Sequence, residues 1–319
     1  MQQQADIDFT MPSESGRKAA MVGVVGRTNA GKSTVVNRMV GEKVSIVSPV
    51  VQTTRNTIRG IVEDDRGQLV LLDTPGLHKA VGHLGKLLNG MARASSAGVD
   101  ILLVVFDAAH APQLEDRGWM ERVSKECPEK CVFALNKCDK APFFETMFRD
   151  TWKEVVEMRG EECKCEPVWV KTSGVRENGC DELLDALYSL AETGPALFPE
   201  DIVTDYPRKL AISDTIREKY LQRLHGEVPH ETGILVTDIK ESDGRWDVAA
   251  TVYVNRKSQK AIVIGPGGKM IKDVRLFSQR ELSMIFGVKV RLELWVKVEP
   301  NWMENKTLLT EMGYMGARQ

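Results

Sequence analysis

The sequence has no apolar run close to the roughly 18 residues that a helix needs to cross a bilayer. It also lacks an internal repeat and a low-complexity block. Its first ~18 residues are polar and include Asp6, Asp8 and Glu14, so they resemble neither a signal peptide nor an Arg-rich, acid-poor transit peptide. We expect residues 1–18 to form a disordered tail. We expect a cytoplasmic protein with at most a weak peripheral contact to membranes.

Cysteine is absent from most of the chain, because all six cysteines lie between Cys127 and Cys180. With no signal peptide ahead of them, free thiols in a reducing compartment are expected. The pairs Cys127/Cys131 and Cys163/Cys165 do not have a common zinc-ligand spacing, so a zinc site is not predicted there.

A strong charge of either sign is also missing, since the net charge is −2 over 319 residues. This balance hides an asymmetry: residues 1–204 carry 24 basic and 30 acidic side chains, and the remainder carries 19 and 15. Between Arg256 and Arg280, Asp273 is the single acidic residue among seven basic ones. A basic surface of this kind suits a partner that carries phosphate, although a solvated face can have the same composition.

The length and the hydrophobic content of 42% allow two globular domains, each with its own core. In the first half, apolar strands such as 100–106 and 131–135 alternate with helix-length segments such as 115–127. This alternation predicts an α/β domain whose mostly parallel sheet is covered by helices on both sides.

The pattern changes after Leu190, where Gly194, Pro195 and Pro199 mark a linker. A helix is expected at 207–224, followed by strands at 233–239, 246–254 and 260–264. A glycine turn at 265–268, a helix at 269–286 and a last strand at 288–298 are expected after them. This order predicts a small α+β domain. We therefore place the first domain at 19–193, the linker at 194–206 and the second domain at 207–319.

A phosphate-binding motif lies between an expected strand and an expected helix. It reads Gly26-Arg27-Thr28-Asn29-Ala30-Gly31-Lys32-Ser33, is followed by Thr34, and matches G-x-x-x-x-G-K-[ST]. Its glycines let backbone N–H groups point at phosphate oxygens, and the helix start adds partial positive charge. Lys32 is expected to reach the β and γ phosphates, and Ser33 to bind magnesium.

Two further motifs end expected strands. Asp73-Thr74-Pro75-Gly76 offers a carboxylate that can hold magnesium through water and an N–H at Gly76 that can contact the γ-phosphate. In Asn136-Lys137-Cys138-Asp139, the carboxylate of Asp139 can accept hydrogen bonds from N1–H and the amine of guanine. Adenine lacks this pair of donors, so the motif predicts GTP rather than ATP.

Two weaker elements complete the predicted site. A backbone N–H of Ser173-Gly174-Val175 can contact guanine O6, although a Ser-Gly turn is the ordinary explanation. In Gln52-Thr53-Thr54-Arg55, a hydroxyl of Thr53 or Thr54 can complete magnesium coordination when the γ-phosphate is present. Such a loop would become ordered with GTP and relax after hydrolysis.

These motifs in this order resemble the translation-factor-related class of P-loop GTPases, and the Era family in particular. The resemblance rests further on DTPGLH at 73–78, FPED at 198–201, IREK at 216–219, LELWVKV at 292–298 and LLTEMGY at 308–314. It implies a GTPase domain followed by a type II KH domain. It also implies binding near the 3′ end of small-subunit (16S) ribosomal RNA and a role in small ribosomal subunit assembly.

The resemblance also bears on catalysis. Leu77 stands where Ras-like enzymes carry a glutamine that positions water. The resemblance therefore assigns catalysis to Lys32, Asn29, Thr54 and Gly76, with GTP or GDP and Mg²⁺ as ligands. Related enzymes use the position of Asn29 to hold potassium, whose charge can replace part of an arginine finger. We hypothesise that K⁺ activates hydrolysis here.

A candidate RNA-binding loop lies in the second half. Ile264-Gly265-Pro266-Gly267-Gly268-Lys269 is a G-x-x-G loop, expected between a strand and a helix, where a nucleic-acid backbone can approach closely. The family often has a basic residue in the middle of this loop. Here the middle residues are Pro266 and Gly267, so one phosphate contact is either lost or moved to Lys269. Lys269, Lys272 and Arg275 lie on adjacent faces of the expected helix and could supply it. RNA rather than DNA is the expected partner, and the chain is expected to be a monomer.

Trp295 and Trp302 allow two interpretations, base stacking or core packing. The apolar alternation around Trp295 favours core packing.

Three functional hypotheses remain open at this point. The first is GTP-dependent RNA binding, in which GTP shifts the KH domain into an RNA-competent position. The second, motivated by the missing glutamine, is a switch that binds nucleotide with negligible hydrolysis. The third is a GTPase acting at membranes or in cell-cycle control, whose KH domain docks proteins; the lack of an amphipathic anchor argues against strong membrane attachment.

Overall fold

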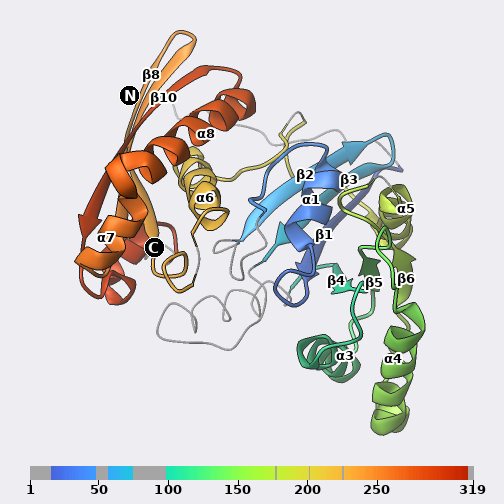
Figure 1. Ribbon diagram of the computed structural model, residues 1–319. Helices are drawn as coiled ribbons and strands as arrows, with labels where there is room; N and C mark the ends of the chain where they lie inside the picture. Colours follow the sequence, from blue (N-terminus) through green and yellow to red (C-terminus); the bar gives the residue numbers. More distant parts are fainter. Residues whose placement is uncertain are drawn as a thin grey trace.

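The computed structural model describes residues 16–47, 57–74, 98–176, 178–200, 202–224 and 226–314. Figure 1 shows two domains joined by a linker, the first coloured blue to green and the second yellow to red. The first domain holds a mostly parallel sheet between helices, and the second holds a three-stranded sheet packed against helices. The predicted order, an α/β domain followed by a small α+β domain, is confirmed.

The sheet of the first domain has the strand order β2-β3-β1-β4-β5-β6, and β7 pairs with β1. Its strands are β1 (Lys18–Val25), β2 (Ile58–Asp64), β3 (Gly67–Asp73), β4 (Ile101–Asp107), β5 (Cys131–Asn136), β6 (Val168–Lys171) and β7 (Glu192–Thr193). The pairs β2–β3 and β1–β7 are antiparallel, and the others are parallel. Strand β2 is an addition to the strands predicted from the sequence, because Arg59 and Gly60 interrupt its apolar pattern.

Helices cover both faces of this sheet. They are α1 (Lys32–Val40), α3 (Leu114–Glu126), α4 (Glu145–Arg159) and α5 (Cys180–Leu190), with a short 3-10 turn, η1 (Gly160–Glu162). Side chains of α1 and α5 share one apolar core with the strands, and side chains of α3 and α4 share another. Strands β4 and β5 are buried along their whole length, which explains their unbroken apolar sequences.

The second domain has the sheet order β10-β9-β8, in which β9 is parallel to β10 and antiparallel to β8. Its elements are α6 (Arg208–Leu221), β8 (Gly233–Ser242), β9 (Arg245–Val254), α7 (Lys257–Ile264), η2 (Pro266–Gly268), α8 (Lys269–Phe286), β10 (Lys289–Val298), η3 (Trp302–Glu304) and α9 (Lys306–Glu311). Helices α6, α7 and α8 share one core with the sheet.

Residues 260–264, expected as a strand, belong to helix α7, so that prediction is wrong. The apolar run at 261–264 suggested a buried strand, yet Val263 is buried while Ile262 is exposed. The side chain of Gln259 accepts hydrogen bonds from the N–H groups of Asn255 (2.9 Å) and Arg256 (3.1 Å) and thereby caps the start of the helix. The glycine loop consequently joins two helices.

The two tryptophans have opposite environments. Trp302 is fully buried, and its indole N–H donates to the carbonyl of Glu231 at 2.9 Å. Trp295 is 66% exposed, so the expectation of core packing is wrong for this residue. The alternation around it is real, but Leu292 and its inward-facing neighbours occupy the other phase of β10, and Trp295 shares the outward face with Glu293.

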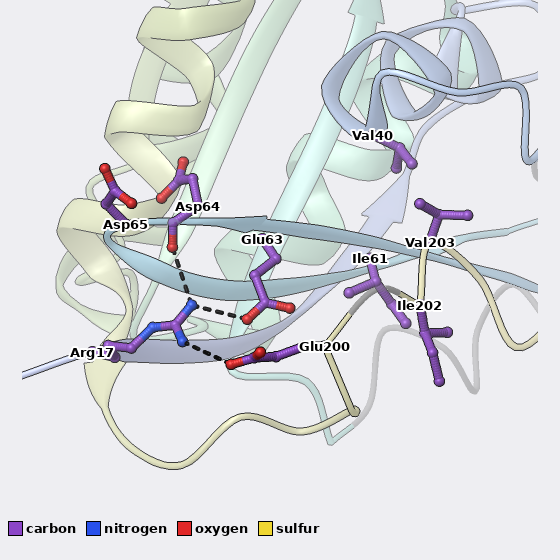
Figure 2. A pocket seen from close by; sticks show the side chains of 9 residues that line it. All are labelled: Arg17, Val40, Ile61, Glu63, Asp64, Asp65, Glu200, Ile202 and Val203. Atoms are coloured by element: carbon purple, nitrogen blue, oxygen red, sulfur yellow. Dashed lines mark hydrogen bonds and ion pairs between the residues drawn. The ribbon is translucent and has the colours of Figure 1, made fainter. Parts of the chain in front are cut away.

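The linker follows the β2–β3 edge of the first domain. The Gln68 side-chain oxygen accepts hydrogen bonds from the N–H groups of Leu197 and Phe198, both at 2.8 Å. The N–H of Ile61 donates to the carbonyl of Val203 at 2.9 Å. A pocket of about 600 Å³ lies between β2 and the linker. Figure 2 shows the side chains that line it: Arg17, Val40, Ile61, Glu63, Asp64, Asp65, Glu200, Ile202 and Val203. Arg17 forms ion pairs there with Glu63 at 2.9 Å and Glu200 at 3.7 Å.

No helix within the described ranges is both long and apolar enough to cross a membrane. The six cysteines are free thiols. Across the same ranges, no three His, Cys, Asp or Glu side chains gather as metal ligands would.

Candidate functional site

The predicted nucleotide motifs meet at one edge of the first sheet. The loop after β1, Asp73 at the end of β3, Asn136 at the end of β5 and the turn after β6 all follow carboxyl ends of strands. Because these strands are parallel, their carboxyl ends lie at the same edge, where ligands of α/β sheets bind.

The phosphate loop needs glycine at two positions. Gly26 has φ 144° and Gly31 has φ 95°, which side chains disfavour. A methyl group at Gly26 would overlap the carbonyl oxygen of Val105, and one at Gly31 would overlap the side-chain nitrogen of Asn136. The loop can therefore pack against β4 and Asn136 only with glycine at both places.

Lys32, the second residue of the motif's G-K-S end, is 6% exposed. Its ammonium donates to the carbonyls of Gly26 (3.2 Å) and Arg27 (2.9 Å), so it lies across the concave side of the loop. Burial lowers the pKa of Lys32 to about 8, and the nearby Asp73 carboxylate opposes this effect.

Asp73 is fully buried beside Lys32. Its Oδ2 accepts a hydrogen bond from the Ser45 hydroxyl at 2.7 Å. Its Oδ1 is buried and has no hydrogen-bond partner in the part of the chain that the structure describes. Burial raises the pKa of Asp73, and the bond from Ser45 is the largest opposing effect. A buried oxygen of this kind requires a partner. The hydroxyl of the motif residue Ser33 also hydrogen-bonds the Asp73 carboxylate. The adjacent Thr74 hydroxyl donates to the carbonyl of Val24 at 2.9 Å, which fixes the end of β3 against β1.

Arg27 anchors the phosphate loop through two carboxylates that the sequence analysis missed. It forms ion pairs with Asp107 and with the buried Asp116, each at 3.1 Å. Lys137 joins the same group, because its ammonium lies 2.7 Å from Asp107 and 2.9 Å from the carbonyl of Asn29. Burial pushes the pKa of Asp107 up, but the hydrogen bond from Lys137 and the positive charges of Lys137 and Arg27 together outweigh it and leave the pKa lowered. Asp107 could have been identified from the sequence, because it is a charged residue at the carboxyl end of a buried strand.

Asn136 connects two loops of the site. Its amide nitrogen donates to the carbonyl of Ala30 at 2.8 Å, and its oxygen accepts from the N–H of Gly174 at 3.1 Å. Gly174 lies close to the start of α1, because a methyl group there would be 3.1 Å from the methyl carbon of Thr34. Asn136 is therefore a structural cross-link between the phosphate loop and the turn after β6.

Asp139 and Ser173 form the predicted base-recognition corner. The Ser173 hydroxyl donates to Oδ1 of Asp139 at 2.6 Å, and this bond lowers the pKa of Asp139. The carboxylate therefore stays charged and keeps its other oxygen available as an acceptor. The N–H groups of Ser173 and Gly174 already donate within the protein, to Asn178 and Asn136. Val175, 71% exposed, follows them in the turn.

Several predicted residues lie outside the described ranges: Gln52, Thr53, Thr54, Arg55, Pro75, Gly76 and Leu77. Their assignments to magnesium, to the γ-phosphate and to catalysis stay predictions. Thr28 and Asn29 are described. Asn29 has φ 60°, a backbone conformation that asparagine tolerates better than most residues.

The glycine loop of the second domain forms a tight connection between Ile264 and Lys269. Gly265, Gly267 and Gly268 have φ values of 74°, 58° and 75°. A methyl group at Gly265 would lie 2.6 Å from the Cβ of Met270, whereas Gly267 and Gly268 face open space. The loop therefore presents bare backbone at the N-terminus of α8, where a phosphate can approach.

Basic side chains flank this loop unequally. Lys269 and Lys272 are exposed and three positions apart on α8, so they share a face. Arg275 is half-buried and donates to the side chain of Gln279 at 3.0 Å. Gln279 in turn accepts from the N–H of Leu292 at 3.0 Å, so Arg275 supports the attachment of α8 to β10.

Two family models match this chain. A model of 50S ribosome-binding GTPases matches residues 21–137, and a KH domain model matches residues 227–303. GTPase Era of Rippkaea orientalis is 37% identical over 300 residues, which cover 94% of this chain and 93% of the relative. GTPase Era of Geobacter sp. is 37% identical over 310 residues, with coverages of 95% and 99%.

Solved structures agree over nearly the whole chain. A crystal structure of Era in complex with MgGDPNP and nucleotides 1506–1542 of 16S ribosomal RNA has a TM-score of 0.84 and 30% identity. A structure of a variant of Aquifex aeolicus Era bound to GDP and aluminium fluoride has the same two values. Each comparison covers 93% of this chain and 99% of the solved one.

Proposed function

Because the chain belongs to the Era family of GTPases, we propose that it couples GTP binding and hydrolysis to the binding of small-subunit ribosomal RNA, and that it acts in small ribosomal subunit assembly. One observation carries this proposal: a guanine-nucleotide site and a KH loop with exposed lysines stand in one chain. The related Era was solved with MgGDPNP and with nucleotides 1506–1542 of 16S ribosomal RNA at the same time.

The buried end of β3 fits a magnesium ion. Asp73 has a buried oxygen, Oδ1, to which none of the described residues donates a hydrogen bond, and hard divalent cations such as Mg²⁺ prefer oxygen ligands. Ser33 and Asp73 would hold the ion, which when bound neutralises charge on the phosphates. Lys32 would leave the two loop carbonyls for the β and γ phosphates, a change favoured by their negative charge.

Guanine selectivity falls to Asp139. Its carboxylate is held charged by Ser173 and can accept both guanine donors. The backbone N–H of Val175 would donate to O6, because those of Ser173 and Gly174 already donate within the protein. Asn136 acts indirectly, by holding the base-binding turn and the phosphate loop together.

Potassium activation is a separate part of the proposal. Asn29 lies at the turn of the phosphate loop, and the carbonyl of Asn29 accepts a bond from Lys137. Its side chain would help to hold K⁺ against the developing negative charge. Single-turnover hydrolysis should be faster in potassium than in sodium buffer at equal ionic strength, and Asn29→Ala should remove the difference. Equal rates in both buffers would contradict this role.

The RNA side of the proposal assigns the phosphate contacts to Lys269 and Lys272. An RNA with the sequence of nucleotides 1506–1542 of 16S ribosomal RNA, labelled with fluorescein, measures it by anisotropy. We expect tighter binding with GDPNP than with GDP. Replacing both lysines by alanine should weaken binding and reduce the slope of log K against log salt by roughly 0.7 per lost phosphate contact.

The matched control is the double variant Lys289→Ala, Arg291→Ala. It removes the same charge from exposed positions on β10 of the same domain. It should leave RNA binding nearly unchanged. Equal losses in both double variants would mean that RNA binding is a non-specific charge effect. Equal affinity with GDP and with GDPNP would refute the coupling. The cytoplasmic location, the weak membrane contact and the monomeric state stay predictions.

A further inference from the structure

The loop between α1 and residue 47 contacts Asp73, the carboxylate proposed above to hold magnesium. Ser45 is 1% exposed, and its hydroxyl donates to Asp73 Oδ2 at 2.7 Å. Asn37 of α1 holds the loop in place, since its oxygen accepts from the N–H groups of Val44 (3.0 Å) and Ser45 (2.7 Å). Its nitrogen donates to the carbonyl of Ser45 at 2.7 Å. The loop therefore delivers one hydroxyl to one oxygen of Asp73.

The same loop contacts the second domain through a ring of four charges. The Lys43 ammonium lies 2.7 Å from Glu218 of α6 and also pairs with Glu281 of α8. Lys219 closes the ring by pairing with Glu218 at 3.1 Å and with Glu281. The N–H of Val47 adds a bond to Glu218 at 3.3 Å. In Figure 1, α6 and α8 lie on the side of the second domain that is nearer the first.

The four side chains of the ring are largely withdrawn from water. The side chains of Glu218 and Lys219 are 3% and 11% exposed, and those of Glu281 and Lys43 are 15% and 31% exposed. Removing one charge from such a ring leaves a buried partner uncompensated. Without Lys43, two carboxylates would share Lys219, and the contact between the domains would weaken.

We propose that Ser45 is a positioning residue for the magnesium carboxylate, and that the ring of Lys43, Glu218, Lys219 and Glu281 makes its position depend on how the second domain is seated. The inference rests on the assignment of Asp73 to magnesium proposed above. It adds that the affinity for magnesium responds to a contact between the two domains.

The physical reason is that the two oxygens of Asp73 have different roles: Oδ2 accepts the bond from Ser45, and Oδ1 is the proposed magnesium ligand. The Ser45 hydroxyl donates to Oδ2 and so holds the carboxylate in a rotation in which Oδ1 has no hydrogen-bond partner among the described residues. Groups that orient a metal-binding carboxylate typically change metal affinity by 10–100-fold. Lys43 lies two residues before Ser45 on a loop of a few residues, so a shift of the ring moves the hydroxyl that orients Asp73.

By linkage, the effect works in both directions. A ligand that seats α6 and α8 more firmly on Lys43 would tighten magnesium binding, and magnesium would favour that seating by the same factor. Helix α8 begins at the glycine loop proposed to bind RNA, so RNA bound at that loop would be the first ligand to examine for this effect.

The test measures the affinity of the whole chain for a fluorescent GDP analogue across a series of free Mg²⁺ concentrations and in EDTA. We expect Ser45→Ala to raise the half-saturating Mg²⁺ concentration about tenfold. Lys43→Met should raise it about fivefold, through the seating of the domain. Affinity in EDTA should not change in either variant, because the phosphate loop and Asp139 remain intact.

Three further variants make the result specific. Ser45→Ala with Lys43→Met should be no worse than Ser45→Ala alone, because Lys43 acts through Ser45. Lys43→Arg keeps the charge and should restore most of the affinity. Arg117→Met is the matched control: Arg117 pairs with Glu121 and Glu154 on the surface of the first domain, away from the ring, and its loss should have no effect.

Other outcomes would overturn the inference. Additive losses in the double variant would separate Lys43 from Ser45. Equal losses in magnesium and in EDTA would mean general damage to the site. Asp73→Asn tests the assignment of Asp73 to magnesium separately from the positioning role of Ser45. If it leaves magnesium affinity unchanged, the assignment of Asp73 fails. If it lowers the affinity while Ser45→Ala and Lys43→Met do not, the assignment stands and the positioning role is refuted.

Discussion

Helix α1 begins after Gly31 and ends before Gly41, and these two glycines allow a controlled test of how the nucleotide site is built. Both have positive φ, 95° at Gly31 and 81° at Gly41. A methyl group at Gly41 would meet nothing within 4 Å, whereas one at Gly31 would overlap the side-chain nitrogen of Asn136. Replacing each by alanine imposes the same type of backbone strain and differs in one contact.

The expected magnitudes follow from these contacts. Gly41→Ala should cost the left-handed strain alone, about 1–2 kcal/mol of unfolding free energy. Gly31→Ala should add the loss of the two hydrogen bonds of Asn136, to Ala30 and from Gly174, at about 0.5–1.5 kcal/mol each. Its total cost should be about 2–5 kcal/mol. Binding of GDP should weaken in Gly31→Ala and stay unchanged in Gly41→Ala.

Urea unfolding measures the first quantity, and titration with a fluorescent GDP analogue measures the second. The decisive background is Asn136→Ala, which removes the atom that the new methyl group would strike. In that background, Gly31→Ala should cost no more than Gly41→Ala does in the unaltered chain. If the two glycine variants lose equal stability, or if the loss at Gly31 persists without the Asn136 side chain, the contact with Asn136 is not the reason for glycine.

Three other predictions test separate parts of the structure. Asp139→Asn should weaken GDP binding on the order of 100-fold, since hydrogen bonds to charged groups contribute about 1.5–3 kcal/mol each. It should strengthen the binding of XDP, whose carbonyl replaces the guanine amine; competition assays that show both nucleotides weakened would contradict this role. Burial pushes the pKa of Glu281 up, but hydrogen bonds from Lys219 and Lys43 outweigh it and leave the pKa lowered. The stabilisation from this carboxylate is therefore present at neutral pH and lost as the pH falls through the lowered pKa. The stability gap between the unaltered chain and Lys43→Met should accordingly close in acid, and urea unfolding at a series of pH values that shows a constant gap would refute it. Trp302→Ala should cost about 3–5 kcal/mol of stability, because the side chain is fully buried. Trp295→Ala should cost less than about 0.5 kcal/mol, because the side chain is largely exposed; similar losses in thermal unfolding would contradict the assignment of Trp295 to the outer face.

The phosphate loop, Asp73 and the Asn136–Asp139 motif could be predicted because their chemistry is local. Each is a short run of residues at the end of a strand, and the parallel sheet brings strand ends to one edge without further information. Two predictions failed for reasons of the same local kind. The run at 261–264 was apolar enough for a strand, but Gln259 caps a helix there. The apolar alternation around Trp295 is present in β10, but Trp295 lies on the outward face and not on the face toward the core.

The amino-acid sequence by itself therefore determined the nucleotide, the class of fold and the position of the glycine loop, because these depend on patterns a few residues long. Only the tertiary structure decided how these parts are held. Arg27 contacts Asp116 across 89 positions, and Lys43 contacts Glu218 and Glu281 across 175 and 238 positions. Charged residues of this kind are common on any surface, and no local pattern marks the few that meet. The fold buries them together, and burial is what gives such contacts their strength.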